Sequence, residues 1–477
     1  MLNRLLSLAC VLVIAMGIAL VPFPDGASAI ALVLVLSIGL IFAFRKYTEE
    51  KEFITTVFLV ALALRMGFGL LIHIYELREF FGGDALAYDA KAAQMVSNWM
   101  GTTINPDDSL FEFDPRSGVA WGMYYITAGI YYVLGQNIFA AQSFCAVIGA
   151  ATSPMVYFCA RKIFSNVSVA RTSAVAIAVF PSFIIWSGQL LKDGLIIFLL
   201  VVAITMVLQL QSKFSYSALA ILITSMFGIL SVRFYIFYMV AVAVVGSFIV
   251  GMSSTQRSML RSTIILFVIG LALAYLGVGQ RATVELTVFT NLDRIQGSRS
   301  DLARAADTGF GAEYDVSTTE GALSAIPLGF TVLMFAPYPW QATNLRQAIT
   351  IPEVLAWWAM IPFLIMGLIY TIKNRLRNAF PILMFSLMLT IAYSVFQGNV
   401  GTAYRQRTQI QVFLFILVGV GWTVFKEERE NKKLLGIAAQ KRVENQIRAG
   451  AQRKIEPEDY FEDQDILEIP PKVGDQR

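Results

Sequence analysis

Long apolar runs dominate the 477-residue chain and limit what it can fold into. Hydrophobic residues make up 57% of it and charged residues only 15%. A helix needs about 20 consecutive, mostly apolar residues to cross a bilayer, and a soluble domain does not contain many such runs. We therefore predict an all-α, polytopic membrane protein. The twelve predicted spans are residues 4–22, 28–44, 53–75, 137–159, 168–186, 189–210, 215–232, 234–252, 262–279, 353–372, 380–396 and 408–425.

Basic residues set the predicted orientation of these spans. Lysine and arginine gather in every second loop, and the positive-inside rule places such loops in the cytoplasm. Both termini are then cytoplasmic, and the other loops face outward from the plasma (inner) membrane. The predicted outer segments are residues 76–136, the turn at 187–188, the turn at Arg233, residues 280–352 and residues 397–407.

The spans and loops divide the chain into four regions. Residues 1–52 hold two N-terminal spans, 53–210 hold a core with the first outer loop, 211–425 hold the further spans, and 426–477 form a charged cytoplasmic tail. The start of the chain also resembles a signal peptide, with a small-residue cleavage site at 27–29, which is the alternative to a first span.

One apolar segment of the large outer loop is too short to be a span. Residues 322–335 number about 14, whereas a span needs about 17 to 25. Counting this segment as a span would also reverse the alternation of the basic loops. We therefore predict a re-entrant or interfacial helix there.

The scarcity of histidine and cysteine narrows the chemistry. His73 is the only histidine, and the three cysteines all lie in apolar runs, so neither a multi-histidine metal site nor a disulfide framework is predicted. Acid–base chemistry must then rest on carboxylates. No cofactor or metal is indicated, although Asp107, Asp108 and Asp114 could supply ligands to a divalent ion. No nucleic-acid partner is expected.

Ionisable and hydroxyl side chains gather where the predicted spans meet the outer face. A charged residue at the centre of a spanning helix costs about 2.5 to 3.5 kcal/mol on insertion scales, so such residues are usually paired or functional. This set supplies the candidate site. Asp84 is the candidate catalytic residue, and the candidate substrate-binding residues are Tyr88, Asp89, Lys192, Asp193, Arg233, Arg405 and Arg407.

Asp84 lies in the segment GGDALAYDA, directly after the third predicted span. Two interpretations are open: its carboxylate caps the helix that follows, or it accepts a proton from a substrate hydroxyl close to the outer headgroups. Tyr88 shares the face of Asp84 one helical turn later. Asp89 is rotated by about 100° from that face and is the weaker candidate.

Arg405 and Arg407 follow a glycine-bearing loop at 398–401, and arginine forks match phosphate oxygens. They suit a lipid-linked phosphate or diphosphate leaving group. The alternative is that they anchor the protein to lipid phosphates. Lys192 and Asp193 either form a local pair or helix cap or take part directly.

Arg65 and the aromatic segment at 335–340 are two other features of the predicted membrane region. Arg65, near the middle of the third predicted span, needs a buried partner, which the sequence does not identify. The segment FAPYPW at 335–340 is either an aromatic anchor at the membrane interface or a rigid wall beside a sugar or prenyl chain.

Residues 53–210 carry a resemblance to a known family. An arginine-bearing span (ALALRMGFGLLIHIY) is followed by GGDALAYDAKAAQMVSNW, a short helix (WGMYYITAGIYYVLGQN), a span ending in ARKIF, and VARTSAVAIAVFPSFIIWSGQLLKDGLIIFLL. This pattern resembles the GT-C superfamily of membrane glycosyltransferases, in particular the branch of protein O-mannosyltransferases and aminoarabinose transferases of lipid A.

The resemblance implies transfer of a sugar from a polyprenyl-phosphate donor to a glycan, lipid or protein acceptor on the outer face. It implies a catalytic aspartate at Asp84, and Asp193 resembles the acidic residue that opens a later family span. The chain departs from the family in two ways: two extra spans precede the usual first span, and the first loop has no Asp-x-Asp. Metal dependence is therefore in doubt.

The working hypothesis is an inverting transfer with Asp84 as base, Arg405 and Arg407 stabilising the phosphate, and the 280–352 loop covering the site. A lipid-linked oligosaccharide polymerase or ligase is the second hypothesis, and would depend more on the arginines. A lipid-glycan flippase is the third. It is disfavoured because transporters place polar groups near the membrane midplane, whereas here they lie at the outer boundary.

Overall fold

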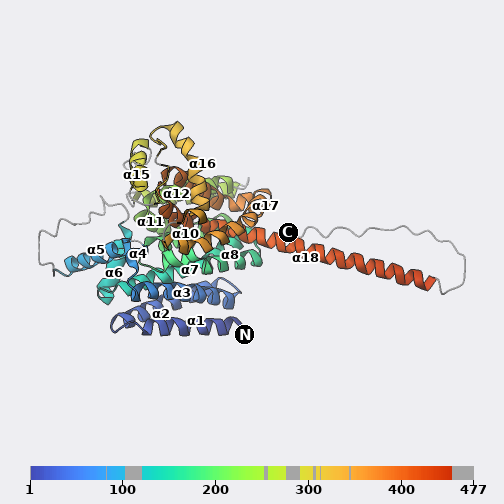
Figure 1. Cartoon of the computed structure of the whole chain (residues 1–477), viewed down its shortest axis with the longest axis horizontal. Helices are drawn as coiled ribbons and strands as arrows, with labels where there is room; N and C mark the ends of the chain where they lie inside the picture. The colour runs from blue at the N-terminus through green and yellow to red at the C-terminus, as the bar shows by residue number, and fades with distance from the viewer. Residues whose placement is uncertain are drawn as a thin grey trace. The chain divides into compact units, whose positions relative to one another are not determined.

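The computed structural model describes residues 2–81, 83–102, 121–251, 256–275, 291–304, 308–311, 313–342 and 345–453. In these residues the secondary structure is helical apart from one isolated β-bridge. Seven of the described helices are long and apolar enough to cross a membrane, or eight if one bent pair is a single span. The chain is therefore a multi-pass, all-α membrane protein, as predicted (Figure 1).

The helices follow the predicted spans in order. Their bounds are α1 (Leu2–Ala19), α2 (Asp25–Lys46), α3 (Lys51–Ile74), α4 (Arg78–Phe81), α5 (Asp84–Trp99), α6 (Gly122–Leu134), α7 (Ile138–Phe164), α8 (Val167–Val179), α9 (Pro181–Ser187), α10 (Lys192–Ser212), α11 (Tyr216–Val232), α12 (Phe234–Gly251), α13 (Gln256–Tyr275), α15 (Leu292–Arg304), α16 (Thr319–Phe335), the 3-10 turn η2 (Pro339–Gln341), α17 (Leu345–Phe396) and α18 (Val400–Arg453).

Eleven of the twelve predicted spans fall on one helix or on part of one, and the span at 168–186 falls on the bent pair α8 and α9. The spans at 353–372 and 380–396 are the two halves of α17, which is interrupted by the non-helical backbone of Arg375. The short apolar segment at 322–335 is helical and begins slightly earlier, at the start of α16. Since α11, α12 and α13 are short apolar helices, twelve crossings stay a prediction.

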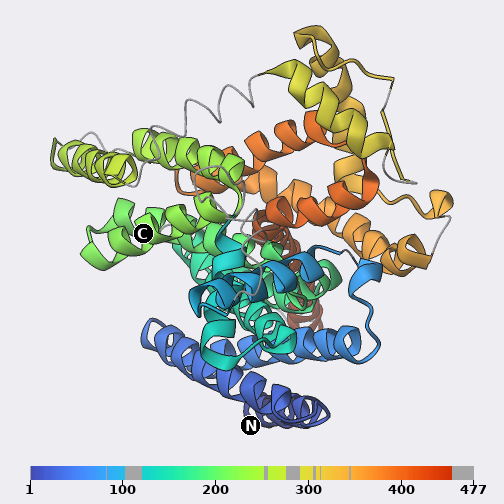
Figure 2. The ribbon, with the colours of Figure 1, turned by 90° about the vertical axis from the view of Figure 1, so that its left-hand side faces the viewer.

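Small residues allow the helices of the unit Met1–Val424 to pack closely around α7 and α10. A Cβ atom at Gly149 of α7 or Gly194 of α10 would lie only 2.3 or 2.5 Å from the Cβ atom of Ser187, at the end of α9. Both positions therefore need glycine, as is common at interfaces between membrane helices. At one edge of the bundle, α1 and α2 pack beside α3 (Figure 2).

A break in the fifth predicted span shapes the region beside the candidate site. Helices α8 and α9 are bent by 55° at Phe180, whose backbone is extended. The residue before a proline disfavours helical geometry, and Pro181 has no N–H to offer the carbonyl of Ile177. The break therefore leaves the last carbonyls of α8 without helical partners.

Arg65 supplies the missing donors. From α3, its Nη2 donates to the carbonyl oxygen of Ile177 at 3.1 Å and its Nη1 donates to that of Ala178 at 3.2 Å. Its Nε donates to Ser187 Oγ at 2.8 Å. The side chain is 1% exposed. The structural role predicted for Arg65 is thus stabilisation of a broken helix.

Loops that the sequence assigns to one side of the membrane contact one another at one end of the bundle. At the end assigned to the cytoplasm, Arg171 pairs with Glu50, Lys162 donates to Gln209, and Arg261 donates to the backbone of Gln211. These contacts join loops that the sequence places on one side. In the second unit, Phe425–Arg477, the chain is helical to Arg453 and the side chains are exposed through residue 447.

We expect Arg65→Lys to lower the thermal unfolding temperature in detergent clearly. A lysine cannot reach three acceptors on two elements, and each buried carbonyl left without a donor costs about 1–3 kcal/mol. Arg171→Lys, at an exposed ion pair, is the matched control and should change the unfolding temperature much less. Equal shifts for the two variants would contradict the role assigned to Arg65.

Candidate active site

Polar residues line a cavity of about 650 Å³ at the end of the bundle opposite to the end that the sequence assigns to the cytoplasm. This volume lies in the range of small-molecule binding sites. Its lining comes from α4 and α5, the end of α9, the first residue of α10, the turn at Arg233, segments of the large loop, and the start of α18. The sequence assigns all of these to the outer segments or to the outer ends of spans, so the predicted convergence occurs.

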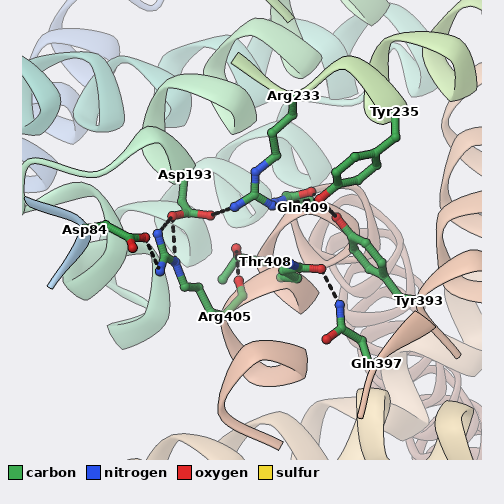
Figure 3. Close-up of polar contacts among 10 residues, drawn as sticks. Asp84, Asp193, Arg233, Tyr235, Tyr393, Gln397, Arg405, Thr408 and Gln409 are labelled. Atoms are coloured by element: carbon green, nitrogen blue, oxygen red, sulfur yellow. Dashed lines mark hydrogen bonds and ion pairs between the residues drawn. The ribbon is translucent and has the colours of Figure 1, made fainter. Parts of the chain in front are cut away.

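Asp84 lies in the cavity wall at the start of α5. The N-cap of this helix is Gly83, and no side chain caps it. The carboxylate instead accepts a hydrogen bond from Arg405 Nη1 at 3.0 Å and keeps 50% of its side-chain surface exposed (Figure 3). The capping interpretation of Asp84 is therefore wrong.

Asp193 is the buried centre of the site, with no exposed surface. Its Oδ1 accepts from Arg233 Nη2 at 2.8 Å, and its Oδ2 lies 2.7 Å from Nε and 2.6 Å from Nη2 of Arg405 (Figure 3). The local pair proposed for Lys192 and Asp193 does not form. Arg405 thus lies between one buried and one accessible carboxylate.

A hydrogen-bonded chain continues from Arg233 into the bundle. Arg233 Nη1 donates to the Tyr235 hydroxyl at 3.3 Å, and the hydroxyls of Tyr235 and Tyr393 are 3.3 Å apart. The Tyr393 hydroxyl donates to Gln409 Oε1 at 2.7 Å (Figure 3). The guanidinium of Arg233 is therefore fixed from α12, α17 and α18 as well as from Asp193.

Two cationic side chains of the lining have no carboxylate within 4.0 Å among the described residues. Lys192 is one of them, at the first position of α10. The other is Arg346, near the start of α17, whose guanidinium lies over the ring of Phe80 at 4.8 Å. Sequence reasoning missed Arg346, because an arginine just before a span is usual at a membrane interface.

Aromatic side chains form another part of the wall. Trp186 lies beside Arg405, whose guanidinium carbon is 5.4 Å from the indole centroid. Tyr404 is held from behind, because its hydroxyl donates to the buried carboxylate of Glu353 at 2.6 Å. Ser182 of α9 also donates to this carboxylate, so the broken span and two later helices fix the same wall.

The glycine-bearing loop and the large outer loop meet at the cavity. Phe310 N donates to the carbonyl oxygen of Gly398 at 2.8 Å, and Val400 N donates to that of Thr308 at 3.0 Å. Thr308 and Asn399, whose side chains share a 3.0 Å hydrogen bond, both line the cavity. The predicted approach of the 398–401 loop to a ligand site is consistent with this geometry.

Four candidate residues lie outside the cavity lining: the buried Asp193, Tyr88, Asp89 and Arg407. Tyr88 is buried with its ring 5.0 Å from that of Tyr124, and burial raises the pKa of its hydroxyl. Asp89 accepts a hydrogen bond from Tyr131, which ties α5 to α6. Arg407 is fully buried. Tyr88 and Asp89 therefore support the position of Asp84 rather than face the cavity.

Arg407 joins α18 to the end of α16. Its Nη1 donates to the carbonyl oxygens of Met334 and Ala336 at 3.1 and 2.9 Å. The segment that follows, 335–340, contributes Pro337 to the cavity wall, while Trp340 is 73% exposed. Pro337 thus fits the interpretation of the segment as a wall of the site, and the exposed Trp340 fits its interpretation as an interfacial anchor. The contacts of Arg407 with the end of α16 give this arginine a packing role.

No cluster of three or more potential metal ligands occurs in the part of the chain that the structure describes. Asp107, Asp108 and Asp114, the carboxylates that could bind a divalent ion, lie outside the described residues.

No protein-family model and no curated protein matches the chain. It is similar to the crystal structure of ArnT from Cupriavidus metallidurans bound to undecaprenyl phosphate, with 15% identity and a TM-score of 0.44. It is also similar to ArnT from the same organism in the apo state, with 14% identity and a TM-score of 0.41. Each alignment covers 74% of this chain but only 57% of that chain. This similarity concerns the fold, and the function rests on the cavity itself.

We expect Asp193→Asn to destabilise the protein more than Asp84→Asn. Removing one partner of a buried ion pair typically costs about 3–5 kcal/mol, whereas an exposed pair contributes about 0–1 kcal/mol. Unfolding temperatures of the two variants in the same detergent measure the difference. A larger loss for Asp84→Asn would show that Asp193 is not the organising carboxylate.

Proposed function

We propose that the chain is a membrane glycosyltransferase that moves a sugar from a polyprenyl-phosphate donor to an acceptor hydroxyl. One observation carries the proposal: an accessible carboxylate, Asp84, shares one cavity with Lys192, Arg233 and Arg405. A base and a set of phosphate-binding cations are the two components that such a transfer requires. Arg407, which is buried away from the cavity, has no part in it.

In the proposed reaction, Asp84 accepts the proton of the acceptor hydroxyl while the hydroxyl oxygen attacks the anomeric carbon. A new C–O bond forms, and the bond from this carbon to the phosphate oxygen breaks. The bonding electrons leave with the phosphate, so its charge changes from −1 to −2. No general acid is needed because the leaving group is stable as an anion. The configuration at the anomeric carbon inverts.

The cations of the cavity would stabilise the phosphate as its charge grows. Arg405 can donate to a phosphate in place of Asp84 through Nη1, because Asp193 holds its other nitrogens. Lys192 has no carboxylate partner among the described residues, so its charge is available to the leaving group. Charge stabilisation that increases toward the transition state raises the rate of the chemical step.

The proposal places the reaction at the outer face of the plasma membrane. The cavity lining comes from segments that the positive-inside rule assigns to that side. The donor would enter from the bilayer, and the acceptor would be a glycan, lipid or protein of the cell surface. Synthesis of cell-surface polysaccharide or another glycoconjugate is the process that this location favours.

We expect Asp84→Asn to abolish sugar transfer at an unchanged protein level, because asparagine cannot accept the proton. The measurement is mass spectrometry of lipid-linked sugars and surface glycans from cells that express the wild type or the variant. A glycan short of one sugar, together with an accumulated polyprenyl-phosphate monosaccharide, supports the proposal. Accumulation of complete lipid-linked repeat units would instead support a polymerase or ligase, and retained transfer would remove Asp84 from the mechanism.

We expect Lys192→Gln to lower kcat by about 10²–10³-fold, the usual effect of losing one group that stabilises transition-state charge. Its unfolding temperature should change little, because Lys192 has no ion pair within the described residues to lose. The rate of transfer by the purified protein, with the donor found by mass spectrometry, measures this effect. Lys192→Arg keeps the charge and should retain much more activity. An unchanged kcat in Lys192→Gln would contradict the role in phosphate stabilisation.

A further inference from the structure

Before transfer begins, the cavity has more positive charge than the single negative charge of a monophosphate donor compensates. Lys192, Arg233, Arg346 and Arg405 line it, and the nearby carboxylates are Asp84 and the buried Asp193. Two positive charges are therefore uncompensated in the described structure. A sugar linked through one phosphate carries a single negative charge, so one cation stays without an anion while this donor is bound.

The two uncompensated cations come from different walls. Lys192 precedes Asp193 at the start of α10, beside the network that contains Asp84 and Arg405. Arg346 belongs to the start of α17 and contacts α4 instead. The two positions suit two anionic groups better than one.

Contacts with α4 position Arg346. Its guanidinium lies over the ring of Phe80, and its Nη2 donates to the carbonyl oxygen of Glu79 at 3.4 Å. Phe80 in turn packs edge-on against Phe81, with ring centroids 5.0 Å apart. Both phenylalanines and Ile349 line the cavity. Arg346 is itself exposed, so its side chain is accessible to a ligand in the cavity.

Since Arg346 makes no contact with the described side chains of Asp84, Asp193 or Arg405, it is not part of the network at which the sugar would be transferred. An arginine in this position can bind a phosphate or carboxylate with two parallel hydrogen bonds.

We propose that Arg346 binds a second oxyanion of the substrates, separate from the phosphate that leaves at Asp84 and Arg405. The oxyanion is either the second phosphate of a diphosphate-linked carrier or the acidic group of a saccharide. This inference rests on the proposed function and adds to it the charge of the substrate. Complementary charge in a cavity selects among substrates of similar shape.

Binding of short carriers to the purified full-length protein tests the inference. The probes are the carriers farnesyl phosphate and farnesyl diphosphate and the saccharides glucuronic acid and glucose, and the binding of each is measured directly. The variants are Arg346→Gln, which removes the charge, and Arg346→Lys, which keeps it without the fork. Arg294→Gln is the matched control, because Arg294 is an exposed arginine of α15 outside the cavity lining.

If the oxyanion is a second phosphate, the wild type binds the diphosphate about tenfold more tightly than the monophosphate. Arg346→Gln then binds both equally, Arg346→Lys is intermediate, and Arg294→Gln behaves as wild type. If the oxyanion belongs to a saccharide, the wild type binds the two carriers equally. Glucuronic acid then binds more tightly than glucose, and Arg346→Gln loses this preference. Either pattern supports the inference and identifies the source.

Two results would overturn it. Equal weakening of both carriers by Arg346→Gln would assign Arg346 to the leaving phosphate, and no effect of this variant on any probe would remove it from the site. In both cases the wild type still binds a prenyl phosphate, so the proposed function survives. Binding of neither carrier by the wild type would overturn the proposed function and this inference together.

Discussion

The buried carboxylate of Asp193 is the interaction on which the candidate site depends. A carboxylate without exposed surface is stable as an anion only if opposite charges and hydrogen bonds compensate it. Here the compensation comes from Arg233, between α11 and α12, and from Arg405, in α18. One side chain therefore fixes three segments that are far apart in the sequence, and Arg405 extends the arrangement to Asp84 at the start of α5.

A second buried group supports the same region by a different physical route. Arg65 donates to carbonyls that the break at Pro181 leaves without helical partners. The short helix beyond the break places Trp186 in the cavity wall and presses Ser187 between two glycines. A proline that would weaken a simple span thus becomes part of the support of the cavity, because an arginine on a neighbouring helix compensates for the lost hydrogen bonds.

The helices and the convergence of the predicted outer loops could be predicted from the sequence, since hydropathy and the alternation of basic loops are local properties. The sequence was not sufficient for the partners of each charge. Asp193 is bonded to residues 40 and 212 positions away, whereas its neighbour Lys192 is not its partner. Helical geometry could have excluded one prediction: residues two apart point about 200° from each other, so Arg405 and Arg407 cannot both face one cavity.

The arrangement of charges also links donor binding to the proposed base. Arg405 uses Nε and Nη2 for Asp193 and Nη1 for Asp84. A phosphate that binds Arg405 must then displace the accessible carboxylate of Asp84 rather than the buried carboxylate of Asp193. Breaking the exposed ion pair costs far less free energy than breaking the buried one. The displaced Asp84 regains its capacity to accept a hydrogen bond, and the acceptor hydroxyl is the group that needs it. In the proposed mechanism the base is therefore released by the arrival of the donor, and Asp193 keeps Arg405 in place during the exchange.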